Sequence, residues 1–171
     1  MSCQSPPRIS DIQSIEAIEF RQAMRNLASG VSIVATGTAV RRRGLTVSSI
    51  TSICMEPPCL LVCINASSET HDAILANGTF GVSLLGGNQQ DLALRFAGRH
   101  LSTVSIQRHG IRAFLTYRFC KAQFVCSNAS CITTNSSAPM GIFIGRIVAT
   151  RSAQGNPLVN FRGELRTLLY G

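Results

Sequence analysis

Two short segments rich in hydroxyl groups are the best candidates for chemistry in this chain. The first reads Thr46-Val47-Ser48-Ser49 and the second reads Asn65-Ala66-Ser67-Ser68, and each lies at the end of an apolar segment typical of a strand. Side-chain hydroxyls and backbone amides placed so closely together suit a polar, flat ligand that carries phosphate.

The second segment leads into an expected helix over residues 69–76. Ser68 is a good N-cap for it, and Glu69 and Asp72 fall in the first turn, where acidic residues are favoured. The first turn of a helix has unpaired amides and a partial positive charge, so residues 67–70 also form a natural seat for a phosphate group. The pattern leaves both interpretations open, because Ser68 can be a cap alone and the two acids compete for the same positive end.

Other kinds of reactive site are missing. The chain has no Gly-x-Gly-x-x-Gly motif, no Walker phosphate loop and no Gly-x-Ser-x-Gly elbow. His71, His100 and His109 lack the spacing of metal ligands, so no metal site is expected. The seven cysteines are odd in number and no secretory signal is seen, so we expect free packing thiols such as Cys59 and Cys63 in a reducing, cytoplasmic compartment.

Length and composition predict a packed globule. The chain has 171 residues, of which 45% are hydrophobic and only 14% are charged, which also indicates buried surface beyond the core of one subunit. No apolar run is long enough to span a membrane, so no membrane partner is expected. The net charge of +8 attracts anions, but Arg41–Arg43 is typical of a solvated hairpin tip and no nucleic-acid-binding motif accompanies it, so nucleic acid is not an expected partner.

Periodicity predicts a flexible arm over residues 1–13 followed by one domain over residues 14–171. Asn88 is the expected cap of a third helix, and the continuous apolar run over 59–64 suggests a strand covered on both faces. The last two expected strands would close the sheet. Many short strands and few short peripheral helices predict a mainly antiparallel β-barrel. The expected helices cover residues 15–27, 69–76 and 88–95, and the expected strands cover 31–36, 45–54, 59–64, 80–85, 124–132, 142–150, 158–161 and 165–169, with a hairpin loop over 37–44.

A series of short motifs follows in order along the chain from Phe20 to Arg166. It comprises Phe20-Arg21-Gln22-Ala23-Met24, Leu27-Ala28-Ser29-Gly30-Val31, Gly44-Leu45-Thr46-Val47-Ser48-Ser49, Glu56-Pro57-Pro58, Leu61-Val62-Cys63-Ile64-Asn65, His71-Asp72, Phe80-Gly81-Val82-Ser83-Leu84-Leu85, Arg95-Phe96-Ala97-Gly98, Phe143-Ile144-Gly145 and Phe161-Arg162-Gly163. In order and spacing this series resembles the short-chain flavin reductases, which are the reductase components of two-component flavin monooxygenases.

The resemblance implies a fold and an activity. The fold would be an FMN-binding split β-barrel of Greek-key, mostly antiparallel topology, assembled as a homodimer. The activity would be that of an NAD(P)H:flavin oxidoreductase, in which NADH or NADPH transfers hydride to N5 of FMN or FAD and the reduced flavin passes to a partner monooxygenase. Two alternatives stay open: a flavoprotein that retains its flavin and reduces another acceptor such as a corrinoid, and a flavin-binding protein with impaired NAD(P)H use.

The resemblance also implies which residues bind the cofactor. Thr46, Val47, Ser48 and Ser49 would hold the isoalloxazine ring and ribityl chain, Asn65, Ser67 and Ser68 the ribityl chain and phosphate, Phe96, Ala97 and Gly98 the flavin tail, and Phe161 and Arg162 would close the pocket.

Two positions depart from the family pattern. Met140 stands where related sequences carry a histidine beside the nicotinamide, and a thioether cannot donate a strong hydrogen bond. Leu165 stands where the family carries an aromatic residue, and residues 101–121 lack the family's Gly/Pro-rich, Trp-bearing pattern. No firm catalytic residue is therefore assigned.

Overall fold

The computed structural model describes residues 14–37, 42–98, 122–133 and 140–169. The predicted arm over residues 1–13 and the atypical segment over 101–121 lie outside the described residues. The elements are α1 (Ala17–Met24), β1 (Ser29–Gly30), β2 (Ser32–Gly37), β3 (Arg42–Val47), β4 (Ile50–Met55), β5 (Pro58–Asn65), α2 (Glu69–Asn77), β6 (Phe80–Leu84), α3 (Gln90–Ala97), β7 (Ala122–Thr133), β8 (Met140–Ser152), β9 (Leu158–Phe161) and β10 (Glu164–Thr167). None of the described helices is long and apolar enough to cross a bilayer.

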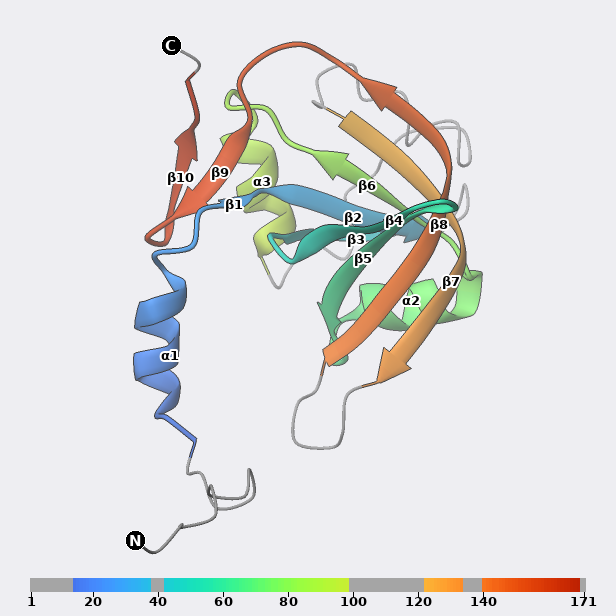
Figure 1. Ribbon diagram of the computed structural model, residues 1–171, viewed down its shortest axis with the longest axis horizontal. Helices are drawn as coiled ribbons and strands as arrows, with labels where there is room; N and C mark the ends of the chain where they lie inside the picture. Colours follow the sequence, from blue (N-terminus) through green and yellow to red (C-terminus); the bar gives the residue numbers. More distant parts are fainter. Residues whose placement is uncertain (1–13, 38–41, 99–121, 134–139, 170–171) are drawn as a thin grey trace, which may run out of the picture.

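Seven strands form one antiparallel sheet in the order β3-β2-β6-β7-β8-β5-β4. Its two edge strands, β3 and β4, are consecutive in the chain and are joined only by Ser48 and Ser49. Because so short a link brings the two edges together, the sheet must curl into a barrel that stays open along one line. Figure 1 shows this curled sheet with α2 beneath it, which confirms the predicted antiparallel split barrel with peripheral helices.

The predicted single strand over residues 45–54 is wrong, because the structure divides it into β3 and β4. β3 pairs with β2, with Thr46 opposite Ile33, whereas β4 pairs with β5, with Ile50 opposite Val62. The chain changes partner at Ser48-Ser49. The residues before and after Ser48-Ser49 are equally favourable for a strand. Strand propensity therefore cannot locate the change of partner.

The prediction that the last strands close the main sheet is also wrong. β9 and β10 instead form a separate three-stranded sheet with β1, in the order β1-β9-β10. This small sheet joins the end of the barrel through Val31, whose amide donates to the Leu158 carbonyl and whose carbonyl accepts from the Leu85 amide, both at 2.9 Å. The sequence thus predicted these two strands, but not that they pair with β1.

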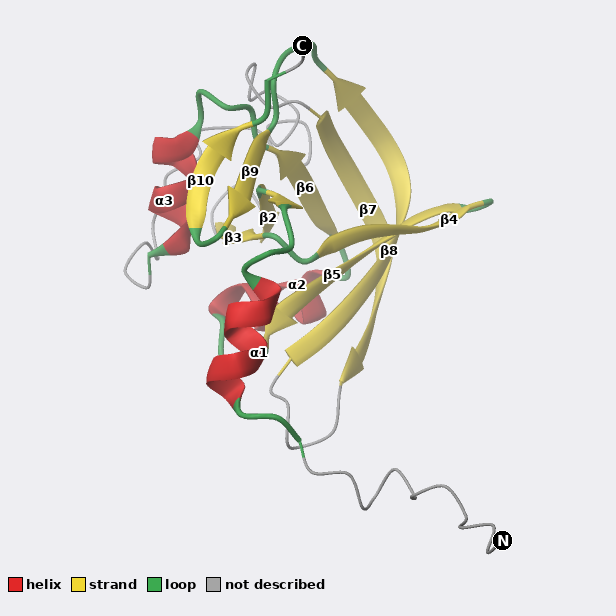
Figure 2. Ribbon diagram, turned by 60° about the vertical axis from the view of Figure 1, so that its left-hand side comes forward, coloured by secondary structure: helices red, strands yellow, loops and turns green. Residues whose placement is uncertain are grey.

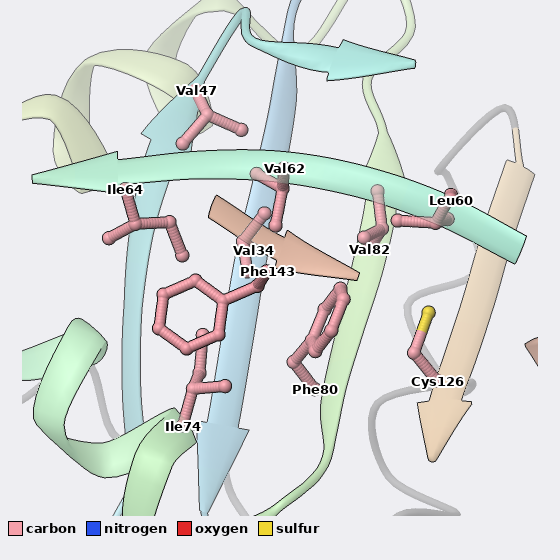
Figure 3. Close-up of a cluster of buried hydrophobic side chains, with 10 residues drawn as sticks. All are labelled: Val34, Val47, Leu60, Val62, Ile64, Ile74, Phe80, Val82, Cys126 and Phe143. Carbon is pink, nitrogen blue, oxygen red and sulfur yellow. The ribbon is translucent and has the colours of Figure 1, made fainter. Parts of the chain in front are cut away.

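The interior of the barrel is a continuous apolar core (Figure 3). It contains Val34, Val47, Leu60, Val62, Ile64, Ile74, Phe80, Val82, Cys126 and Phe143. A second cluster lies between α3 and the sheet and contains Val31, Ile33, Ala35, Leu85, Ala93, Phe96 and Leu158. α3 thus covers the outside of β2 and β3, while α2 closes the barrel from below (Figures 1 and 2).

Side chains along β5 alternate between the core and the outer face. Val62 and Ile64 are buried, whereas Cys59, Leu61 and Cys63 are only half-buried on the opposite face. The prediction of a strand covered on both faces is therefore wrong for a single chain. Cys59, Leu61 and Cys63 thus share the outer face of β5.

The predicted N-cap residue is observed for α2 but not for α3. Ser68 caps α2, as expected, and Gly78 ends the helix with a left-handed φ of 62°. The predicted cap at Asn88 is wrong, because α3 begins after Gln89, whose side-chain oxygen instead accepts from the Gly86 amide at 2.8 Å.

α1 has no buried residue, and its apolar positions face outward. Ile18 is 57% exposed and Met24 is 45% exposed. The apolar side chains of the helix predicted over 15–27 therefore form a surface that the other described residues do not cover.

Candidate functional site

The two hydroxyl-rich segments lie side by side along the open line of the barrel. The Ser49 hydroxyl donates to the Cys63 carbonyl at 2.8 Å, and the Cys63 amide donates to the Ser49 carbonyl at 3.1 Å. Asn65 follows two residues after Cys63. We call this line the seam, with Thr46–Ser49 on one side and Asn65–Ser68 on the other.

The first side of the seam divides into packing residues and exposed residues. The Thr46 hydroxyl donates to the Ala93 carbonyl at 2.6 Å, which ties β3 to α3, and Val47 is buried in the core. Ser48 and Ser49 are exposed at the point where the chain passes from one strand partner to the other. These two residues therefore offer accessible polar groups, while Thr46 and Val47 hold them in place.

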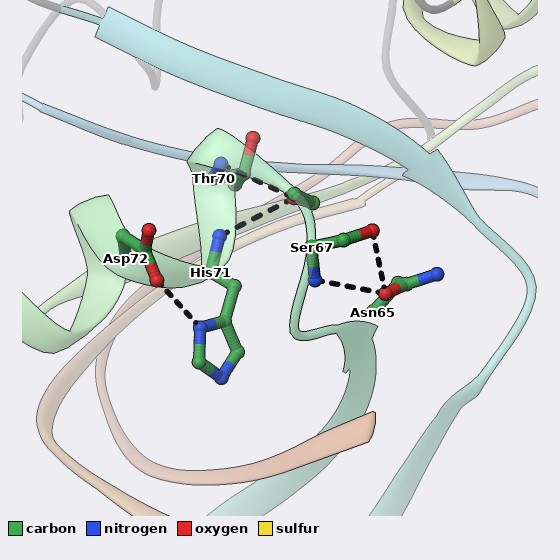
Figure 4. A network of polar contacts seen from close by, with 6 residues as sticks. Asn65, Ser67, Thr70, His71 and Asp72 are labelled. Carbon is green, nitrogen blue, oxygen red and sulfur yellow. Dashed lines mark hydrogen bonds and ion pairs between the residues drawn. The ribbon is translucent and has the colours of Figure 1, made fainter. Parts of the chain in front are cut away.

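The second side of the seam is an ordered polar turn that leads into α2 (Figure 4). The Asn65 side-chain oxygen accepts from both the amide and the hydroxyl of Ser67 at 2.9 Å, and the Ser68 amide donates to the Asn65 carbonyl at 3.0 Å. The Ser68 hydroxyl oxygen accepts from the amides of Thr70 and His71 at 3.1 and 3.3 Å. The expectation of unpaired amides over residues 67–70 is thus wrong for these groups, because the turn bonds them internally.

A cation that the sequence reasoning missed spans the seam. Arg43 Nε lies 2.6 Å from Glu69 Oε2, which joins β3 to the first turn of α2. Arg42 and Arg43 are half-buried within β3, so their assignment to a solvated hairpin tip is wrong, while Arg41 lies outside the described residues. The pairing reduces the negative charge that Glu69 brings to the helix end.

The segment at the end of α3 has one buried and two exposed members. Phe96 is buried against Gly44, where a Cβ atom would lie 3.0 Å from the Phe96 ring. Ala97 and Gly98 are exposed at the end of the helix. Phe96 therefore packs α3 against β3, which leaves Ala97 and Gly98 as the accessible part of this motif.

Phe161 ends β9 in the small sheet, and Arg162 lies in the turn that follows it. Figure 1 places this turn away from α2. The Arg162 guanidinium lies over the Phe161 ring, 5.4 Å from its centroid. Within the part of the chain that the structure describes, no hydrogen bond joins this turn to Asn65–Ser68. The structure thus brings the two sides of the seam together but keeps this third motif apart.

The sequence of this chain matches the profile of a known protein family. The profile of the flavin reductase like domain matches residues 24–169. This chain belongs to the flavin reductase family. The match covers the barrel, both sides of the seam and the small sheet.

Individual relatives agree with the family. The reductase component of a 4-nitrophenol 4-monooxygenase/4-nitrocatechol 2-monooxygenase from Rhodococcus opacus is 30% identical over 168 residues, which is 94% of this chain and 86% of that protein. An FMN reductase (NADH) RutF from Pseudomonas syringae pv. syringae (strain B728a) is 41% identical over 93 residues, or 54% of this chain, so the match spans about half (52%) of that relative. The structure of the styrene monooxygenase flavin reductase from Pseudomonas putida S12 superposes with a TM-score of 0.76 at 29% identity, covering 90% of this chain and 99% of that one.

In this member of the flavin reductase family, Met140 lies directly beside the seam. It begins β8 and is half-buried opposite Asn65 on β5. The next residue, Gly141, faces the core, where the buried His71 ring lies close to it. His71 Nδ1 lies 3.0 Å from Asp72 Oδ1, and His71 Nε2 has no hydrogen-bond partner among the described residues. Sequence reasoning named His71 as a residue without metal-ligand spacing and as part of the His71-Asp72 motif, but assigned it no role in the site.

The described thiols of the barrel belong to no candidate metal site, and one of them, Cys126, is buried. Burial, with a smaller contribution from Cys59, raises the pKa of Cys126 to about 12, so this thiol stays protonated at neutral pH. Among the described residues no group of three or more His, Cys, Asp or Glu side chains could hold a metal ion.

Proposed function

We propose that this chain is an NAD(P)H-dependent flavin reductase that passes reduced FMN or FAD to a partner monooxygenase. The observation that carries the proposal is the seam, where exposed Ser48 and Ser49 lie beside the polar turn of Asn65 and Ser67 in a chain that belongs to the family over residues 24–169. The names of the relatives, an FMN reductase (NADH) and a monooxygenase reductase component, support the cofactor and the partner.

The residues of the seam fit a flavin. When bound, the flavin supplies a ring that accepts a hydride from NADH or NADPH. Ser48 and Ser49 present exposed polar groups that would orient the ring and stabilise the negative charge that reduction brings to it. They need no acid–base partner for this role, because the alignment of two rings is the main requirement for hydride transfer.

The polar turn at α2 fits the ribityl chain and the phosphate. Asn65 and Ser67 are exposed there, and Ser68 lies at the positive end of the helix. Because the turn already bonds its amides internally, the exposed hydroxyls and the Arg43 side chain would make the first contacts with a phosphate.

A homodimer in the cytoplasm completes the proposal. On the outer face of the barrel, half-buried Leu61 and Cys63 of β5 lie opposite half-buried Ile144 and Ile142 of β8, which makes a surface suited to a second copy. The five described cysteines are all free thiols, which agrees with a reducing compartment. We also propose that residues 14–171 form one domain.

The absorbance of added FMN or FAD under anaerobic NADH, and then NADPH, tests the activity. We expect binding of at least one flavin and loss of its visible absorbance when the nicotinamide nucleotide is added. Failure to bind either flavin, together with no NAD(P)H oxidation in its presence, would overturn the proposal. Ser48→Val places a bulkier side chain at the seam and should weaken flavin binding. Ser52→Val, on exposed β4, is the control and should leave flavin binding unchanged.

One observation favours a second candidate, a flavin-binding protein with impaired NAD(P)H use. Met140 beside Asn65 cannot supply the strong hydrogen bond of the histidine that the family carries there. Flavin binding with very slow oxidation of both NADH and NADPH would distinguish this candidate from the first.

A further inference from the structure

The turn between β9 and β10 holds an arginine in a conformation that arginine rarely adopts. Phe161 pairs with Glu164, so Arg162 and Gly163 alone make the turn, with φ of 54° and 82°. A two-residue hairpin turn with both residues left-handed favours Asn or Asp followed by Gly. Arg162 is therefore strained, and such strain persists only where the surrounding structure enforces it.

Arg25, at the end of α1, provides that enforcement. The Arg162 amide donates to the Arg25 carbonyl at 2.9 Å. In return, Arg25 Nε and Nη2 donate to the Arg162 carbonyl at 3.1 and 2.8 Å. Both backbone polar groups of the strained residue are thus bonded to one residue far away in the chain.

Gly163 is required by the same arrangement. A Cβ atom at this position would lie 2.7 Å from Arg25 Nη2, and the positive φ disfavours a side chain independently. Position 163 therefore favours glycine for two reasons, while the bonds between Arg25 and residue 162 use only the backbone of the turn.

The arrangement presents the Arg162 guanidinium on an exposed aromatic ring. It lies over Phe161, which is 37% exposed. Among the described residues no carboxylate pairs with Arg162, because the nearby Glu164 is paired with Arg166. A cation stacked on an accessible ring suits a ligand that combines phosphate with a flat ring.

The reaction needs two such ligands, and the seam supplies a phosphate seat for only one of them. We propose that Phe161 and Arg162 bind the phosphate and ring portion of the nicotinamide dinucleotide, and that Arg25 is the positioning residue that holds Arg162 for this contact. This inference rests on the proposed flavin reductase function. It differs from the expectation that the two residues close the flavin pocket, because the turn lies apart from the α2 end of the seam.

The test compares Arg25→Ala, Arg25→Lys and Arg162→Asn with Arg166→Ala, which removes a positive charge from the same hairpin. Asparagine accepts the left-handed conformation, so Arg162→Asn keeps the turn and removes only the guanidinium. We expect the first three variants to raise the KM for NADH or NADPH roughly tenfold, as for loss of a charged hydrogen bond, while kcat and the Kd for FMN stay within about twofold. Arg166→Ala, made together with Glu164→Gln so that no unpaired carboxylate is left beside Arg162, should leave all three constants unchanged.

A purely structural role would give a different result. It would lower the melting temperature of the Arg25 variants without changing the KM for the nicotinamide nucleotide, or would change flavin and nicotinamide affinities equally, and either outcome overturns the inference. Arg162→Asn keeps the test valid if an Arg25 variant fails to fold.

Calorimetric titration of NADH and NADPH into the flavin-free protein separates the two proposals. If the protein binds a nicotinamide nucleotide but does not reduce flavin, the proposed activity fails while the Kd of Arg25→Ala still tests the positioning role. If flavin is reduced and Arg25→Ala binds the nucleotide as the native chain does, only the further inference fails. Absence of both binding and turnover overturns both.

Discussion

The imidazole of His71 occupies the space that a side chain at position 141 would need. A Cβ atom on Gly141 would lie 2.6 Å from His71 Nε2 and 3.0 Å from the Phe143 ring. His71 and Phe143 pack edge to face, with ring centroids 5.2 Å apart, so neither ring has room to retreat. A glycine one residue after Met140 is therefore a packing requirement of α2 against β8.

We expect Gly141→Ala to lower the free energy of unfolding by about 1–3 kcal/mol, as overpacking of a core does. Gly30→Ala is the matched control, because no atom lies within 4 Å of a Cβ atom at that position. Urea unfolding of both variants provides the measurement. Equal stability of the two would show that His71 can move aside.

Ser68→Ala should destabilise the flavin-free protein by about 1 kcal/mol, because the amides of Thr70 and His71 lose their acceptor. Ser68→Thr should retain most of the native stability, since threonine is also an effective cap. Thermal or urea unfolding measures both variants. If threonine is as harmful as alanine, the hydroxyl is not the stabilising group.

Cys54 and Cys59 should form a disulfide under mild oxidation with diamide, which accepts the two thiol hydrogens as the S–S bond forms. The register of β4 on β5 shifts by one residue between Ser52 and Cys54, and this shift places Cys54 opposite Cys59. Opposed residues in antiparallel strands have Cα atoms about 4.5–5.5 Å apart, within the range that a disulfide spans.

Peptide mass spectrometry after digestion identifies the bridge between Cys54 and Cys59, and Cys59→Ser is the control that should leave Cys54 free. The other neighbour of Cys59 is Cys126, whose pKa of about 12 keeps it protonated and unreactive. A dominant bridge between Cys59 and Cys126 would contradict the prediction.

Met140→His should increase the rate of NADH oxidation with saturating FMN, because it restores a hydrogen-bond donor opposite Asn65. Met140→Leu keeps the apolar character and should leave the rate unchanged. Steady-state kinetics at fixed flavin concentration compare the three proteins. An unchanged rate for the histidine variant would show that position 140 does not contact the nicotinamide.

Sequence patterns located most elements because each depends on neighbouring residues. Ser68 begins α2 and Gly78 ends it, through interactions that reach only a few positions along the chain. β9 was predicted with its observed bounds, Leu158–Phe161. The order of short motifs also identified the family correctly. These features follow from local residue types and their spacing along the chain.

The same sequence patterns did not predict which distant strands pair with one another. Residues 45–54 look like one strand, yet their two halves join opposite edges of the sheet, and β9 and β10 pair with β1 instead of closing the barrel. The amides at the start of α2 looked free, yet Asn65 and Ser68 bond them. In each case the outcome depends on which segments the curled sheet brings together.

Local chemistry therefore specified most of the strands, the cap of α2 and the motifs of this member of the flavin reductase family. Folding in three dimensions specified the bonds between Arg25 and Arg162, which are 137 positions apart, and the contact between His71 and Gly141. The physical reason is that propensity and capping act over a few residues, whereas strand partners and side-chain contacts depend on the free energy of burying the whole sheet around one core.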